Sequence, residues 1–414
     1  MSDFELFVGG VKIDTFINGW VKRQLDTVSD SFEFQFADLR TDLSQDVPVR
    51  AGEPCFIKLD GRTLLTGYVD DVSVQYNSNR LTLTARGRSK TSDLVDCSAV
   101  RESGRWRKAT IRTIVQDLCD PFGLDVQLSP NMEGVEERFS RFAIEPGETA
   151  ADAIQRACRL RAVWATCTVD GDLLLTRAGL NDQATTALEY GENIISGERF
   201  DSWARRHNLY LLKGQVPSDD EFSGKSAAQI SELISDEGLD RYRPLLLVST
   251  GQDRKGDLRR RAQWERNRRA GSGERWLYRV DGYGFNRTEY VGPFASRRRE
   301  RLVAWEPNQT VRVNDPRTNT VDQNLLVSSV SFRWQAGGDD GGRTTDLGLN
   351  RREAFSLQTY PARKRKKVYK LAPSPGDLER GAQGPPALIN QVDFWPRDHE
   401  RNAQGPPSPP KRKR

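Results

Sequence analysis

Residues 55–65 read Cys55-Phe-Ile-Lys-Leu59, then Asp60-Gly61, then Arg62 and Thr63-Leu-Leu65, which is two apolar runs joined by a short polar link. The pair Asp-Gly accepts the positive φ of a type I′ turn, so this stretch predicts a β-hairpin. Upstream, Phe32, Phe34 and Phe36 alternate with polar residues, which is typical of a strand with one buried face. Short strands separated by closely spaced turns favour a β-barrel or sandwich over residues 4–100.

The spacing of apolar residues changes from strand-like to helical between residues 105 and 178. Thr110 can cap a helix whose apolar positions follow at helical spacing, namely Ile111, Ile114, Val115 and Leu118. A second helix is expected from Thr149, which forms a T-x-x-D cap with Asp152. Asp170-Gly171 then links two apolar runs into another hairpin. Two helices on short strands predict a small α+β module.

Residues 190–350 return to strand patterns, with Val330, Phe332 and Trp334 alternating with polar neighbours. Two helices are expected as insertions, a short one over 226–236 and a strongly basic one over 257–270 that Gly271 ends. The basic helix has one candidate buried stripe, formed by Leu258, Ala262 and Trp264. We therefore expect its arginines to form mostly a solvated or packing face rather than a phosphate-binding row.

These patterns predict a mainly β fold with α+β content, divided into four segments. Residues 1–100 are expected to form a first β-barrel, 101–180 a small α+β, lysin-motif-like module, and 181–350 a second β-barrel with inserted helices. Residues 351–414 are expected to be an extended or disordered tail, because they are rich in proline and basic residues and poor in apolar ones.

Composition and charge exclude several classes of protein. No run approaches the ~18 apolar residues of a membrane-spanning helix. The five cysteines are scattered, which favours a reduced protein over a disulfide framework. Residues 351–414 hold 15 Lys or Arg and 6 Asp or Glu, a net charge of +9 against +5 for the whole chain. The folded part is therefore slightly acidic, and a whole-protein nucleic-acid surface is not indicated.

Few residues suggest chemistry. The two histidines, His207 and His399, have no cysteine or second histidine at a metal-ligand spacing, and no G-x-S-x-G elbow is present. Gly224-Lys225-Ser226 imitates the end of a phosphate-binding loop, but Asp219 stands where that loop needs glycine. We therefore predict no enzyme activity, no catalytic, cofactor-binding or metal-binding residue, and no cofactor.

The tail contains an apolar island, Val392-Asp-Phe-Trp-Pro396, between basic clusters at 363–367 and 411–414. A solvated linker is one interpretation. The other is a docking peptide that binds a partner through Phe394 and Trp395.

The order of several motifs resembles the Mu-type contractile phage baseplate hub proteins, a late-control tail hub family. The motifs lie between residues 4 and 350: Phe4-Glu-Leu-Phe-Val-Gly-Gly-Val-Lys-Ile-Asp14, Gly19-Trp-Val-Lys-Arg23, Asp30-Ser-Phe-Glu-Phe-Gln-Phe36, Pro121-Phe-Gly-Leu124, Pro146-Gly-Glu-Thr149, Arg261-Ala-Gln-Trp-Glu-Arg-Asn-Arg-Arg269 and Leu325-Leu-Val-Ser-Ser-Val330. The tail at 351–414 matches nothing in that family.

The resemblance implies a structural protein of the virion tail, assembled in the bacterial cytoplasm. It implies a homotrimeric ring that joins a sixfold tail tube, or a tube-initiator protein, to a threefold central spike. Contacts with baseplate wedge proteins and the tape-measure protein are also implied. DNA would pass through the ring during genome ejection without being bound specifically.

Three alternatives remain at this point. The chain resembles the hub part of a type VI secretion spike as well. The segment 101–180 could bind peptidoglycan, which would make the chain a cell-wall-binding tail protein. The basic helix and tail could instead bind nucleic acid in a salt-dependent manner.

Overall fold

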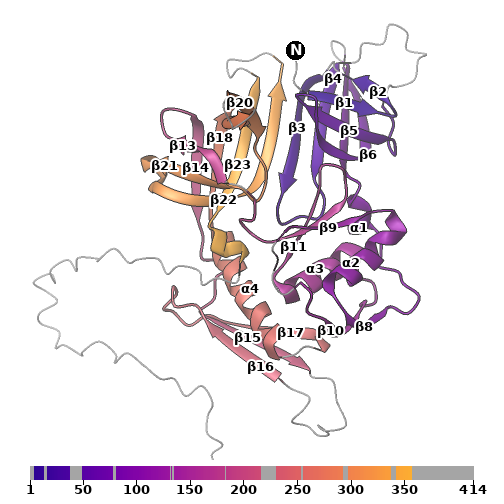
Figure 1. Cartoon of the computed structure of the whole chain (residues 1–414), viewed down its shortest axis with the longest axis vertical. Helices are drawn as coiled ribbons and strands as arrows, with labels where there is room; N and C mark the ends of the chain where they lie inside the picture. The colour runs from indigo at the N-terminus through magenta and orange to yellow at the C-terminus, as the bar shows by residue number, and fades with distance from the viewer. Residues whose placement is uncertain are drawn as a thin grey trace, which may run out of the picture. The chain divides into compact units, whose positions relative to one another are not determined.

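A computed structural model describes residues 4–13, 16–37, 49–77, 81–130, 132, 135–181, 183–215, 230–252, 255–291, 297–336 and 342–356. All of these lie in one compact unit, Met1–Ala362. No helix in the described ranges is both long enough and apolar enough to cross a bilayer. Figure 1 shows the strands and helices with the labels used below.

The first part of the chain folds into seven strands: β1 (Phe4–Val8), β2 (Val11–Ile13), β3 (Phe16–Gln24), β4 (Ser31–Ala37), β5 (Pro54–Leu59), β6 (Arg62–Tyr76) and β7 (Leu81–Ser89). The predicted hairpin is confirmed as β5–β6, with Asp60 at φ 49° and Gly61 at φ 74° in its turn. The predicted buried face of β4 is confirmed too, because Phe32, Phe34 and Phe36 are all buried.

The second part is the predicted α+β module, with elements α1 (Ser92–Asp96), β8 (Arg105–Ala109), α2 (Ile111–Cys119), β9 (Val126–Leu128), β10 (Phe139–Ala143), α3 (Ala150–Arg161), β11 (Trp164–Cys167) and β12 (Leu173–Thr176). Both predicted helix starts are confirmed. The Thr110 side chain accepts from the backbone N–H of Thr113, and Thr149 forms a full capping box with Asp152.

The third part contains the remaining strands: β13 (Gln183–Glu189), β14 (Ile194–Asp201), β15 (Leu209–Gln215), β16 (Ile230–Ser235), β17 (Pro244–Gln252), β18 (Glu274–Asp281), β19 (Gly284–Val291), β20 (Arg297–Ala304), β21 (Thr310–Asp315), β22 (Thr320–Gln335) and β23 (Arg343–Asn350). Helix α4 (Lys255–Gly273) and the 3₁₀ turn η4 (Arg352–Phe355) complete it.

Of the two predicted insertions, only the basic helix is confirmed. Helix α4 runs two residues past Gly271, and Leu258, Ala262 and Trp264 are buried on it. The helix predicted over 226–236 is wrong, because residues 230–235 form strand β16, which pairs antiparallel with β15. Pairing with a neighbouring strand overrides a weak local helical spacing.

The principal sheet joins the first and third parts of the chain. Its 13 strands include the path β14-β18-β23-β22-β3-β4-β7-β6-β5-β1-β2, in which β22 pairs with β3. One hydrophobic core runs under both halves of this sheet, from Phe4 and Phe34 to Trp276 and Leu349. The mainly β fold class is confirmed, while barrel closure and the four segment boundaries stay predictions.

Gly19 on β3 tests how tightly this sheet is packed. A Cβ there would lie 2.2 Å from Cδ1 of Phe34, so Gly19→Val forces a buried ring to move. We expect a loss of about 1–3 kcal/mol of unfolding free energy, the usual cost of overpacking a core. Denaturant titration measures it. Lys22→Val, on the same strand but half-exposed, is the control, and equal losses in the two variants would contradict this packing.

Candidate functional site

The pairing of β3 with β22 unites two stretches of chain that are about 300 residues apart. Seven residue pairs are in register, from Ser329 opposite Gln24 to Gln335 opposite Asn18. The Trp334 ring packs edge-on against Phe16, with centroids 4.9 Å apart. The Leu25 amide also donates to the carbonyl of Ser328 (2.9 Å). This β3–β22 pairing, called the seam below, is therefore as extensive as the pairing of the strands on either side of it.

The strands on the two sides of this seam form two similar units. Unit A is β3-β4-β7-β6, and unit B is β14-β18-β23-β22, with the strands given in sheet order. Both units connect their strands in the same chain order, and in both the long fourth strand pairs with a further antiparallel strand, β5 or β21. The two units are thus a repeat, placed one after the other in a single sheet.

Irregularities in the strands give the repeat its register. The pairing of the first two strands shifts between Phe16 and Asn18 in unit A and between Ile194 and Ser196 in unit B. The pairing of the last two strands shifts at Val69/Asp71 and at Val327/Ser329. Gly19 and Gly197 are equivalent, and a Cβ at either would strike an aromatic ring, that of Phe34 or Tyr278. Matching bulges and glycines in the same places identify equivalent residues.

The outward face of the continuous sheet is polar and crossed by ion pairs. Asp346 on β23 accepts from Arg279 on β18 (2.7 Å) and from Arg333 on β22 (2.6 Å). Arg86 on β7 pairs with Glu33 on β4 (2.5 Å). Partial burial alone would raise the pKa of Asp346, but hydrogen bonds from the two arginines outweigh burial and hold that pKa below its ordinary value.

The α+β module is anchored to this sheet by hydrogen bonds at the β3–β4 turn. Within the sheet, Arg23 Nε lies 3.0 Å from Asp30 Oδ2, and both side chains are almost fully buried. From the module, the Cys167 thiol of β11 donates to the same carboxylate (3.2 Å), and the Thr166 hydroxyl donates to the carbonyl of Gln24 (2.9 Å). A buried ion pair stabilises only when its remaining hydrogen bonds are satisfied, and the module supplies one of them.

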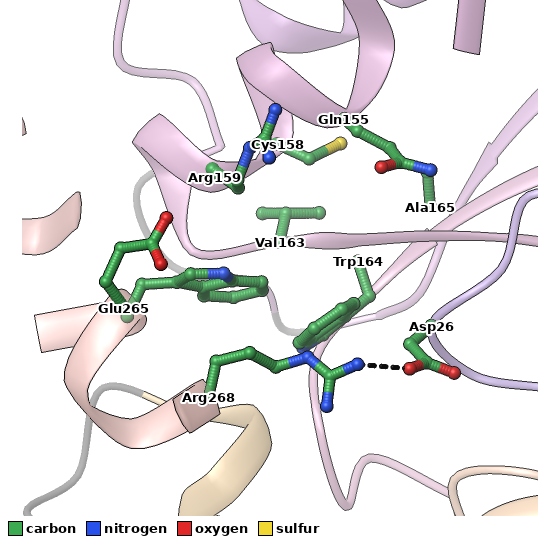
Figure 2. Close-up of a pocket in the computed structure, with 10 residues that line it drawn as sticks. Asp26, Gln155, Cys158, Arg159, Val163, Trp164, Ala165, Glu265 and Arg268 are labelled. Carbon is green, nitrogen blue, oxygen red and sulfur yellow. Dashed lines mark hydrogen bonds and ion pairs between the residues drawn. The ribbon is translucent and has the colours of Figure 1, made fainter. Parts of the chain in front are cut away.

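Helix α4 braces the module, and a pocket of about 200 Å³ lies beside it. Figure 2 shows residues that line it, and both Trp164 and Trp264 belong to this lining. Their ring centroids are 4.2 Å apart, and the Trp164 indole N–H donates to the carbonyl of Phe355 (2.9 Å). Arg268 of α4 pairs with Asp26 of the β3–β4 turn, as the dashed line in Figure 2 marks. Arg260 of α4 pairs with Glu137 of the module (2.8 Å), so these two arginines join α4 to other parts of the fold.

The residues that the sequence singled out for chemistry do not converge. The half-buried His207 lies just before β15, where its backbone N–H donates to the Tyr210 hydroxyl (3.1 Å), and burial lowers its pKa. Asp170-Gly171 is a hairpin turn. The described residues include no cluster of His, Cys, Asp or Glu suited to a metal ion. Burial raises the pKa of four thiols to about 12, which leaves them poor nucleophiles: Cys55, Cys119, Cys158 and Cys167.

Several predicted features lie outside the described residues. They are Gly224-Lys225-Ser226, His399, the docking residues Phe394 and Trp395, and the basic clusters at 363–367 and 411–414. The docking role of the tail therefore stays a prediction.

Two family models match adjacent parts of the chain. Residues 3–89 match the N-terminal domain of Mu phage baseplate assembly protein GpP-like proteins, and residues 91–177 match the second domain of baseplate hub protein gp44-like proteins. Over 371 residues the chain is 28% identical to the baseplate hub protein gp44 of Escherichia phage Mu, covering 88% of this chain and 90% of that protein.

The chain is thus similar to phage baseplate hub proteins of the Mu type over most of its length. A solved structure supports this, the 43 kDa tail protein of prophage MuSo2 from Shewanella oneidensis, at 28% identity and a TM-score of 0.71. The match covers 85% of the hub protein and 99% of that chain. A tail protein from Neisseria meningitidis has the same fold, at 19% identity, a TM-score of 0.66 and coverage of 86% and 99%.

The sequence predicted most strands and helices of the hub protein and two β-rich parts at residues 1–100 and 181–350, but it did not reveal which residues of the two parts are equivalent. The available signal was weak, since only a glycine opposite an aromatic residue, Gly19 or Gly197, recurs in both units. The β15–β17 sheet and α4 separate the first two strands of unit B, which hides the repeat from any fixed sequence period.

Replacing Trp264 tests whether the contact between α4 and the module stabilises the fold. Trp264→Ala empties the space beside Trp164 and should cost about 3–5 kcal/mol of unfolding free energy, as for other buried aromatics. Trp203→Ala is the matched control, because Trp203 is 37% exposed against 5% for Trp264, and it should cost clearly less. Chemical denaturation measures the loss of unfolding free energy in each variant. Similar losses would contradict a stabilising contact between α4 and the module.

The ion pairs of Asp346 with Arg279 and Arg333 predict that the stability of the fold depends on pH. A carboxylate whose pKa is lowered on folding contributes stability above its unfolded pKa, and this contribution is lost as the pH falls through the folded pKa. Asp346→Asn should therefore lower stability by about 1 kcal/mol at pH 7, and this loss should shrink as the pH is lowered through the folded pKa of Asp346. Thermal melts of both proteins across this range check it. A stability difference between the two proteins that does not change with pH would contradict a stabilising role of the ionised Asp346 carboxylate.

Proposed function

We propose that this hub protein forms a homotrimeric ring that joins the sixfold tail tube to a threefold central spike. Its relation to gp44 of phage Mu supports a place at the centre of a baseplate. The observation that carries the proposal is the repeat within the sheet, because each chain supplies two similar units, A and B. Three copies arranged around an axis present six such units.

Two similar units per chain would let a single protein connect a threefold spike to a sixfold tube. A ring with threefold symmetry can bind a trimeric spike through surfaces that occur once per chain. The same ring can bind a sixfold tube through surfaces that occur twice per chain. The insertions differ between the units, since only unit B carries the β15–β17 sheet, α4 and the β19–β20 hairpin. One end of the ring can therefore be nearly sixfold and the other strictly threefold.

The remaining assignments follow from this placement. We propose the spike, the tube or its initiator, wedge proteins and the tape-measure protein as partners, with DNA passing through the ring during ejection. The function is structural, with no catalytic step. The domain division at residues 100, 180 and 350 is also proposed, and the adjoining family models at 3–89 and 91–177 support its first boundary.

Light scattering on the full chain, alone and with its co-expressed spike protein, tests the trimer. We expect a mass near three times 46.8 kDa per assembled hub. Negative-stain images of the same sample should show a three-lobed ring with a central hole. Monomers under both conditions, at every concentration reached, would overturn the proposed ring.

A further inference from the structure

The pocket beside α4 lies where three parts of the chain meet. Its lining comes from the β3–β4 turn, which supplies Asp26, from the α+β module and from helix α4. In Figure 2, α3 carries Gln155 and Arg159 above Val163, and α4 carries Glu265 and Arg268 below it. The Gln155 side chain is exposed, so solvent has access to the pocket. The structural role proposed above makes no use of this pocket.

One part of the lining is apolar and aromatic. Trp164 and Trp264 are 8% and 5% exposed, and the chain neighbours of Trp164, Val163 and Ala165, are buried as well. Indole rings pack well against other flat, apolar groups, in offset-stacked or edge-on arrangements. This part of the pocket therefore suits a flat ring.

Four charged side chains also line the pocket, and both carboxylates among them are already paired. Asp26 accepts from Arg268, and Glu265 lies 3.3 Å from the Nε of Arg269 on the same helix. Arg159 is the exception, because no carboxylate among the described residues lies within ion-pair distance of it. Its guanidinium is therefore available to an anion.

The surroundings of Arg159 make an anion favourable there. Arg159 is half-buried, and burial, followed by the positive charge of Arg261, lowers its pKa, which Glu265 offsets only in part. A guanidinium that has lost part of its hydration is stabilised by charge-assisted hydrogen bonds, and a carboxylate can accept two of them in parallel. The pocket thus combines an unpaired cation with an aromatic surface.

We infer that this pocket binds a small aromatic carboxylate, with the carboxylate on Arg159 and the ring against Trp164 and Trp264. The volume limits the ligand, since an apolar cavity of about 150 Å³ holds one benzene ring. The pocket, at about 200 Å³, has room for one ring and one carboxylate, whereas drug-sized ligands occupy sites of about 300 Å³ or more. The ligand would contact all three parts of the chain and stabilise their packing.

Fluorine NMR on the full-length protein tests the site, with 4-fluorobenzoate as the probe. We expect saturable binding with a dissociation constant on the order of 1 mM, because the ligand is small. The probe 4-fluorobenzamide keeps the ring but carries no charge, so it should bind about tenfold or more weakly. Acetate keeps the charge but has no ring, and it should compete poorly for the site.

Two variants place the carboxylate on Arg159. Arg159→Gln removes the charge and should weaken binding of 4-fluorobenzoate about tenfold or more. Gln155→Glu should weaken it as well, because residues 155 and 159 are one turn apart on α3 and the new carboxylate would pair with Arg159. Arg112→Gln, at an exposed position of α2, is the control and should bind the probe as the unmodified protein does.

Melting temperatures show whether each variant is folded. Gln155 is exposed, so Gln155→Glu tests the site even where Arg159→Gln does not fold. Weaker binding by the folded variants, with Arg112→Gln unchanged, supports the inference.

Three results would overturn the inference. They are no saturable binding by the unmodified protein, equal binding by all variants, and acetate competing as well as benzoate, which would indicate an ion site without a ring contact. None of these results depends on whether the protein forms a ring, so the site and the proposed function are tested separately.

Discussion

The pairing of β3 with β22 is the constraint on which the rest of this hub protein depends. It joins strands about 300 residues apart and turns two separate groups of strands into one sheet with one core. Closing so long a loop is entropically costly, and the cost is offset by a fully registered strand pair and a buried aromatic contact. Because the seam sets unit A beside unit B, it also produces the repeat on which the proposed ring rests.

Charge is used in this molecule mainly to position its parts. Arg23 and Asp30 form a buried ion pair at the β3–β4 turn, which the module contacts through the Cys167 thiol, and Arg268 of α4 reaches the same turn through Asp26. Replacing either partner of a buried pair leaves a buried charge without compensation, which is strongly destabilising. Two arginines of α4, Arg260 and Arg268, thus serve contacts between parts of the chain.

The sequence was sufficient to predict those turns and helix ends that short-range interactions determine. The Asp60-Gly61 turn, the Thr110 cap and the Thr149–Asp152 capping box each need only a few neighbouring residues, and each is present. The helix expected over 226–236 failed because β16 is held by its partner β15, which no local pattern reveals. The equivalence of individual residues in units A and B was hidden for the same reason, since it is defined by bulges and by pairing across insertions. The family resemblance, carried by the order of many weak motifs, was predictable and is confirmed.

The proposed function depends on how units A and B are arranged around an axis, and a cryo-electron-microscopy reconstruction of the assembled full-length protein measures this most directly. We expect three copies around one axis, with the six units alternating A and B in a nearly sixfold ring. Separate single copies, or units A and B at unrelated positions around the axis, would contradict the proposed ring.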